Sequence, residues 1–262
     1  MLALALALAR RVCQAANRLR AVKVRSRVCH PRLWRYERIR RGVAEEAIAG
    51  QGIEVGALHS AFPVPKAAKV HYVDHLSTED LHAEYPELAD QPFVNVDLVD
   101  DGETLATIPD QSQDFVIASH FLEHCEDPVG TLQAHLRVLR LGGTLLLALP
   151  DRRHGIDRHR QATTLEHIVA DHEQGPETSR ADHYREWARL VDLPLGNITA
   201  DQVDAHAAAL EQRRYSIHFH CWTDEEFRQQ LGAISERFDL PVRVASHRTN
   251  HHEFLVTLKR AA

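Results

Sequence analysis

Four polar side chains that could carry out proton transfer stand together in the sequence, directly after a short apolar run. The run is residues 114–118, and Ser119, His120, Glu123 and His124 follow it. Because the pKa of an imidazole lies near neutrality, a histidine can take a proton from an acceptor hydroxyl group. We therefore predict His120 or His124 as a general base. The alternative for His124 is a hydrogen bond to the backbone of its own loop.

A predicted strand–helix–strand unit positions these side chains. Residues 114–118 suit a strand that is buried on both faces. Asp127 and Pro128 are good residues for a helix start, and Gly142 is expected to end that helix. A second apolar strand follows at residues 144–149. Since ligands bind beyond the carboxyl ends of parallel strands, the unit would place the four polar side chains at a binding site.

Two segments of this unit resemble a known family. DFVIASHFLEHCEDP (114–128) and RVLRLGGTLLLALPD (137–151) are similar to the fourth-strand to fifth-strand region of class I S-adenosylmethionine-dependent methyltransferases, in a subgroup with LEH-x-x-DP and RVL-x-x-GG motifs. The resemblance implies an α/β fold: a doubly wound, Rossmann-like, mostly parallel seven-stranded sheet with an antiparallel last strand and a helical cap insertion. It also implies S-adenosylmethionine as the cofactor. The other predicted strands are 52–56, 70–76, 93–98 and 216–221, and a closing hairpin of 241–247 with 252–259.

The family pattern assigns cofactor-binding roles to five residues: Glu54, Gly56, Asp74, Asp97 and Ser119. By resemblance, Asp74 would hold the ribose hydroxyls and Asp97 would meet the adenine. The glycine-rich turn departs from the family pattern, because Gly-x-Gly-x-Gly is replaced by GALHS at residues 56–60. Without the second and third glycines, the backbone approaches a ligand less closely. The departure favours a rival reading, a catalytically inactive binding or scaffold protein, whereas the retained Asp74 and Asp97 favour an enzyme.

Residues 151–214, after the fifth predicted strand, are expected to form a helical cap over the substrate. His218 and His220 lead in from this cap and are predicted to line the acceptor pocket. The 19 histidines also suggest a metal-dependent enzyme on the same fold, with His218 and His220 on one face of a strand and His251, His252 and Glu253 nearby. The sequence holds no HExxH motif and no cysteine partner for them, so we predict no metal site.

The charge distribution separates residues 1–44 from the rest of the chain. They carry 12 of the 31 Lys and Arg residues and one acid, whereas residues 45–262 carry a net charge of −17. We predict a basic, helical N-terminal extension at 1–44 and a methyltransferase-like domain at 45–262. The extension could contact an acidic partner or the inner membrane surface. An acidic body argues against nucleic-acid binding. The four scattered cysteines suit a reducing cytoplasm, so we expect a cytoplasmic protein.

These observations lead to one expected function and two alternatives. The expected function is an S-adenosylmethionine-dependent methyltransferase for a small or sugar-like acceptor, with transfer to oxygen in cell-surface glycan or secondary metabolite biosynthesis. The alternatives are the inactive binding protein and the metal-dependent enzyme.

Overall fold

The computed structural model describes residues 31–88 and 90–262. A seven-stranded sheet with the strand order β3-β2-β1-β4-β5-β7-β6 forms its centre. The strands are β1 (Gln51–Val55), β2 (Lys69–Asp74), β3 (Leu98–Val99), β4 (Gln113–Ser119), β5 (Leu139–Pro150), β6 (Val242–Asn250) and β7 (Glu253–Arg260). Neighbouring strands from β3 to β5 run parallel, and β7 is antiparallel to both of its neighbours. The predicted fold class is confirmed.

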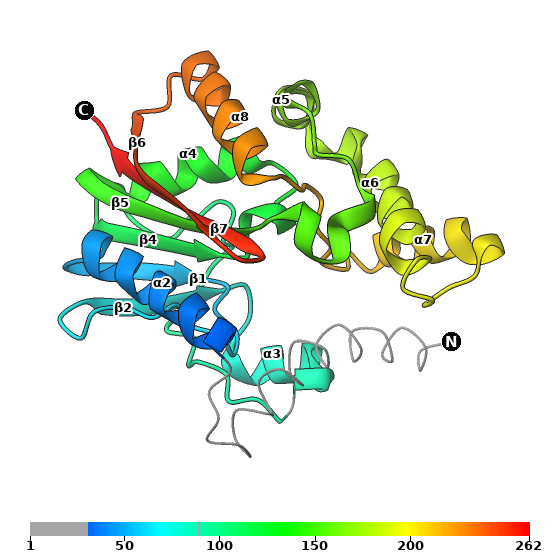
Figure 1. Ribbon diagram of the computed structural model, residues 1–262, viewed down its shortest axis with the longest axis horizontal. Helices are drawn as coiled ribbons and strands as arrows, with labels where there is room; N and C mark the ends of the chain where they lie inside the picture. Colours follow the sequence, from blue (N-terminus) through cyan, green and yellow to red (C-terminus); the bar gives the residue numbers. More distant parts are fainter. Residues whose placement is uncertain (1–30, 89) are drawn as a thin grey trace.

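Helices cover both faces of the sheet (Figure 1). They are α2 (Pro31–Ala47), α3 (Thr78–Glu84), α4 (Pro128–Val138), α5 (Leu165–Gln174), α6 (Arg180–Trp187), α7 (Val203–Gln212) and α8 (Asp224–Arg237). On one face, α4 and α8 pack against the sheet with apolar residues such as Leu132 and Phe227. On the other face, Val43, Ala44 and Ile48 of the α2 region pack against Phe115 and neighbouring strand residues. Burying both faces explains why β4 and β5 read as continuous apolar runs.

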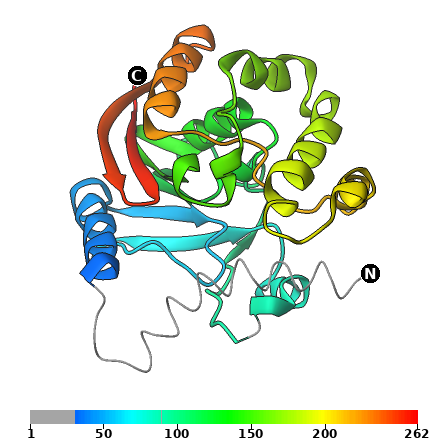
Figure 2. The ribbon, with the colours of Figure 1, turned by 45° about the vertical axis from the view of Figure 1, so that its right-hand side comes forward.

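Along the chain, helices α5, α6 and α7 come between β5 and α8, where the helical cap was predicted (Figure 2). Helices α6 and α7 share an apolar cluster with Ile217 and Phe219, separate from the two clusters that contact the sheet. Arg180 of α6 binds Glu126 through two hydrogen bonds of 2.7 and 2.6 Å. This bidentate ion pair fastens the cap to the loop that follows β4.

Three predicted elements differ from the structure. Residues 93–96 do not pair with β2, because Val94 donates its N–H to Leu58 O and Val96 donates to Thr78 Oγ1; β3 is therefore only Leu98–Val99. Residues 216–221 form no strand, because Arg160 takes the backbone carbonyl oxygens of His218 and Phe219 at 2.7 and 2.9 Å.

The helix predicted to end at Gly142 ends earlier, at Val138. Strand β5 begins with the next residue, and its pairing with β4 jumps from Leu139 to Thr144. Gly142 has φ 77° within this bulge, a left-handed conformation that glycine adopts without a steric penalty.

The predicted N-terminal extension falls partly outside the described residues. Residues 1–30 lie outside them, and the rest of the extension belongs to α2, which packs on the sheet. The division at residue 44 and the contact with a membrane surface or an acidic partner therefore stay predictions. Among the described helices, none combines the length and apolar character that a membrane crossing requires.

Candidate functional site

Three predicted cofactor residues stand at one level of the sheet, at its carboxyl edge. Val55 of β1 lies opposite Val73 of β2 and Ala118 of β4 in parallel register. The residue that follows each of them is a predicted cofactor contact, and these residues are Gly56, Asp74 and Ser119. The carboxyl ends of β1, β2 and β4 therefore lie side by side, as the parallel order predicts.

The loop after β1 is tightly folded although it lacks the family's later glycines. Gly56 has φ 65°, and a Cβ atom there would lie 3.1 Å from the ring of Phe121. Leu58 also has a positive φ, 45°, which is uncommon for a residue with a branched side chain. No helix forms between Gly56 and β2. The loop is therefore a variant of the family turn. The contacts around it keep Leu58 in a strained backbone conformation.

Glu54 of β1 is completely buried and keeps one oxygen free of hydrogen bonds. Its Oε1 accepts the N–H of Phe62 at 2.7 Å, which ties the loop to the strand. Its Oε2 has no hydrogen-bond partner among the described residues. Burial raises the pKa of Glu54 to about 7, although Phe62 and Arg40 act in the opposite direction. A buried acceptor without a donor can receive a hydrogen bond from a ligand.

Asp74 and Asp97 lie at different heights along the sheet edge. Asp74 ends β2, is buried, and accepts the N–H of His75 at 2.9 Å. Asp97 instead accepts the N–H of Tyr72 at 2.9 Å, two residues before the end of β2. The acid that stands beyond the end of β3 is Asp100, which donates its N–H to Asp74 O. This placement does not favour Asp97 as the adenine contact.

His120 lies between two buried glutamates. Its Nε2 is 2.9 Å from Glu253 Oε2, and its Nδ1 is 3.5 Å from Glu123 Oε1. Burial alone would lower the pKa of His120, but its contacts with Glu123 and Glu253 outweigh burial and raise that pKa to about 9. At neutral pH the ring is therefore an imidazolium. This state does not favour His120 as the general base.

Glu253 has a full set of hydrogen-bond donors. It accepts two bonds from Arg40, at 2.9 and 2.5 Å, and further bonds from Tyr36 and Asn250, at 2.9 and 2.6 Å. Burial would raise the pKa of Glu253, but Arg40 and His120 outweigh it and hold the pKa well below its usual value. Arg40 and Glu253 are 213 residues apart, so no local sequence pattern announces their pairing.

Glu123 is as buried as Glu253, but neither of its oxygens has a hydrogen-bond partner among the described residues. It can place one oxygen within 4.8 Å of a ring nitrogen of both His124 and His218. Burial acts to raise the pKa of Glu123, and the nearby His120 more than offsets it, so the pKa is lowered. The side chain is therefore a buried carboxylate without a direct donor. The sequence pattern predicts Glu123 in the loop after β4 but assigns it no catalytic or binding role.

His124 is a neutral imidazole with a defined tautomer. Its Nδ1 lies 2.9 Å from the carbonyl oxygen of Ile217 and 3.0 Å from Ser216 Oγ. Because a carbonyl oxygen only accepts hydrogen bonds, we assign the proton to Nδ1, which leaves Nε2 as the basic nitrogen. Burial, together with His218, lowers the pKa of His124 to about 4. The backbone partner of His124 is therefore not its own loop, as the alternative expected, but Ile217, 93 residues away, and Nε2 can still accept a proton.

The two histidines predicted to line the acceptor pocket face different parts of the structure. His218 Nδ1 lies 2.6 Å from Asp157 Oδ2, and its ring meets His124 edge-on with 4.7 Å between centroids. The backbone bends at Phe219, and His220 Nε2 lies 3.7 Å from Asp171 Oδ2 in a second cluster. Only His218 joins the group around Glu123.

A known protein family matches part of the chain. Residues 49–147 match the family model of a methyltransferase domain. No curated protein matches the chain. The matched region contains Glu54, Gly56, Asp74, Ser119 and Glu123, the residues at the carboxyl edge of the sheet.

Solved structures are similar to this chain at low sequence identity. A protein from Rhodobacter sphaeroides described as a candidate Zn-dependent alcohol dehydrogenase has a TM-score of 0.52 and 18% identity, covering 87% of this chain and 90% of its own. A SAM-dependent methyltransferase from Aquifex aeolicus has a TM-score of 0.46 and 13% identity, covering 88% and 94%. A SAM-dependent methyltransferase from Thermotoga maritima has a TM-score of 0.44 and 13% identity, covering 87% and 93%.

The matched region can be compared with the cofactor that such domains bind. Residues 49–147 match a methyltransferase domain, a class of proteins that uses S-adenosylmethionine as its cofactor. The described residues fit this cofactor: the unpaired Oε2 of Glu54 suits an ammonium group, and Asp74 at the end of β2 suits the ribose hydroxyls.

Proposed function

We propose that the chain is an S-adenosylmethionine-dependent methyltransferase that transfers the methyl group to a hydroxyl oxygen of a small or sugar-like acceptor. One observation carries the proposal: Glu123 is a fully buried carboxylate without a hydrogen-bond donor among the described residues, beside the neutral ring of His124. The group lies just beyond β4, next to β1, which Gly56 follows. A buried carboxylate with open acceptor positions suits a ligand rich in hydroxyl groups.

The cofactor side of the proposed site uses four of the predicted residues, Glu54, Gly56, Asp74 and Ser119. The turn at Asp100 takes the place of Asp97 at the adenine, because it is the acid that stands beyond the end of β3. When bound, S-adenosylmethionine supplies an electrophilic methyl group on its sulfonium.

On the acceptor side, Glu123 orients the hydroxyl group and His124 accepts its proton. The acceptor hydroxyl donates a hydrogen bond to Glu123, which orients its oxygen for attack. His124 Nε2 takes the hydroxyl proton as the new oxygen–carbon bond forms. The negative charge of Glu123 stabilises the imidazolium that results, and His120 positions Glu123 from its other side.

A sugar-like acceptor in cell-surface glycan or secondary metabolite biosynthesis also agrees with the variant turn. The sequence from Glu54 through Pro65 resembles that of a methyltransferase-like subgroup linked to cell-surface sugar biosynthesis. The rival, a binding or scaffold protein without methyl transfer, draws on the same turn, because Leu58 and Ser60 replace two glycines. Cofactor binding separates the two.

The acceptor is tested by incubating the protein with S-adenosylmethionine and a panel of nucleotide sugars, free sugars and phenols, with methylated products and S-adenosylhomocysteine measured by mass spectrometry. We expect an O-methylated product. Glu123→Gln and His124→Gln should each lower kcat by roughly 10²–10⁴-fold, the usual contribution of a positioned proton acceptor. The control is His82→Gln, an exposed histidine that stacks on Phe93. Methylation at nitrogen or carbon, or unchanged kcat in both variants, would contradict the proposal.

A further inference from the structure

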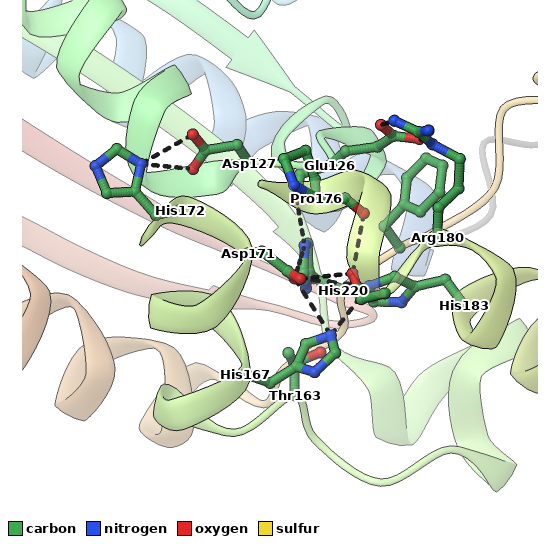
Figure 3. Close-up of polar contacts among 12 residues, drawn as sticks. Glu126, Asp127, Thr163, His167, Asp171, His172, Pro176, Arg180, His183 and His220 are labelled. Atoms are coloured by element: carbon green, nitrogen blue, oxygen red, sulfur yellow. Dashed lines mark hydrogen bonds and ion pairs between the residues drawn. The ribbon is translucent and has the colours of Figure 1, made fainter. Parts of the chain in front are cut away.

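A second cluster of histidines and a carboxylate lies in the cap, outside the group around Glu123. His167 and Asp171 come from α5, His183 comes from α6, and His220 comes from the extended segment before α8. In Figure 3 the four side chains point toward one another. His167 and Asp171 are four residues apart and therefore share one face of their helix.

The four donor atoms are spaced as the ligands of a single metal ion would be. Asp171 Oδ2 lies 3.2, 3.6 and 3.7 Å from the Nε2 atoms of His167, His183 and His220. The Nε2 atoms of His167 and His183 are 3.0 Å apart. Zinc–ligand bonds of about 2.0–2.1 Å in a tetrahedron place neighbouring ligands about 3.3–3.4 Å apart. The observed distances scatter around this value.

Burial makes the cluster unfavourable without a cation. Asp171 and His220 are 1% and 0% exposed. Asp171 Oδ2 has no hydrogen-bond partner among the described residues, and the His220 Nε2 that faces it lies 3.4 Å from Glu126 O. An unpaired buried polar atom costs about 1–3 kcal/mol, and more when it is charged. A divalent ion at the centre would give Asp171 Oδ2 the positive partner that it lacks.

The carboxylate is also held in place from behind. Ser179 donates its hydroxyl to Asp171 Oδ1 at 2.5 Å, which fixes the direction of Oδ2. Such outer hydrogen bonds are typical of metal ligands. The neighbouring Arg180 binds Glu126, as Figure 3 shows, so the surrounding segments are firmly connected.

We propose that His167, Asp171, His183 and His220 bind one Zn²⁺ ion. Three imidazoles and one carboxylate suit zinc, and four protein ligands complete a tetrahedron. The site differs from the one considered from the sequence, because His218 and Glu253 take no part in it. The ligands come from α5, α6 and the segment before α8, so the ion cross-links the cap. Its role is structural, and the proposal stands whether or not the chain methylates a hydroxyl group.

The test is the zinc content of protein purified without a histidine tag, measured by elemental analysis after dialysis. We expect about one zinc per chain, which is the loading of one four-ligand site. His167→Gln should lower zinc affinity more than tenfold in a chelator competition, since loss of outer-shell partners alone costs 10–100-fold. His167 is the mildest ligand to replace because its side chain is 37% exposed. The matched control is His172→Gln on the same helix, which should keep the wild-type affinity.

Two further readouts do not depend on activity. Protein loaded with Co²⁺ should show the intense visible absorption of four-coordinate cobalt, and Asp171→Asn should lose it. A chelator should lower the melting temperature and expose residues 151–214 to protease. Wild-type protein that fails to retain zinc after incubation with the ion overturns the proposal. Unchanged affinity in His167→Gln and Asp171→Asn also overturns it, and so does loss of zinc in His218→Gln alone, which would place the ion beside Glu123.

Discussion

Two glutamates with the same burial flank the ring of His120, yet they differ in their hydrogen-bond partners. Glu253 and Glu123 both have no exposed surface. Glu253 receives hydrogen bonds from Arg40, Tyr36 and Asn250. Glu123 receives none from the described residues, and its contact with His120 is 3.5 Å long.

The difference separates a carboxylate that serves the fold from one that is available to a ligand. A buried charge with a complete set of donors joins distant segments, here α2 and β7, and has no capacity left for chemistry. A buried carboxylate whose acceptor sites are open keeps that capacity, and such groups are found at functional sites. Residue type and burial alone would not distinguish the two, because the partners decide the role.

The largest expected effect comes from removing the charge of each glutamate in turn. Glu253→Gln leaves Arg40 buried without its partner, and we expect a loss of about 3–5 kcal/mol in the free energy of unfolding. Glu123→Gln removes only a long contact and a buried charge, so its change should stay within about 1 kcal/mol. Urea unfolding of both variants and the wild type measures these values. An equal decrease in the free energy of unfolding of the two variants would contradict the proposed difference between the glutamates.

A smaller effect is expected from pH, through the ring that the two glutamates share. The pKa of His120 is about 9 in the folded protein, above the usual value of 6.5. Its contribution to stability is therefore fully present below pH 6.5 and is lost as the pH rises through 9. Stability should fall across this window, and the fall should be shallower in His120→Gln. Urea midpoints measured at several pH values give both profiles, and parallel profiles would contradict the assigned pairing.

The strand–helix–strand core was predictable because its signals are local. Asp127 accepts the N–H of Gly130 at the start of α4, as an N-cap residue should. Thr223 and Glu226 form a capping box at the start of α8, a signal that spans only four residues. Apolar runs then mark β4 and β5 as strands buried on both faces. These features depend on residues a few positions apart, which a sequence shows directly.

Misread elements share a physical cause, which is a distant partner for the backbone. Residues 216–221 alternate like a strand, but the guanidinium of Arg160 takes their carbonyl oxygens in place of a neighbouring strand. Residues 93–96 read as a strand, but Leu58 and Thr78 take their N–H groups. The pairing of a polar side chain with a remote backbone leaves no periodic trace in the sequence.

The residues of the candidate site also divide into those with a local sequence signal and those whose surroundings come from distant segments. The positions of Gly56, Asp74 and Ser119 at one edge of the sheet were predictable because each stands at the end of a strand. The surroundings of Glu123 and His220 depend on distant side chains. His120 was expected to accept a proton because of its position. Its pairing with Glu253, 133 residues away, makes it an imidazolium instead.

The most direct test of the account is a calorimetric titration of the purified protein with S-adenosylmethionine and S-adenosylhomocysteine. We expect binding to the wild type with a Kd of roughly 1 μM to 1 mM, the range of substrate affinities common for enzymes. Asp74→Asn should weaken it at least about tenfold, or 1.4 kcal/mol, by removing the ribose contact. The matched variant Asp97→Asn should bind like the wild type, because Asp97 is engaged with Tyr72. Absence of binding to either ligand by the wild type would contradict the methyltransferase account.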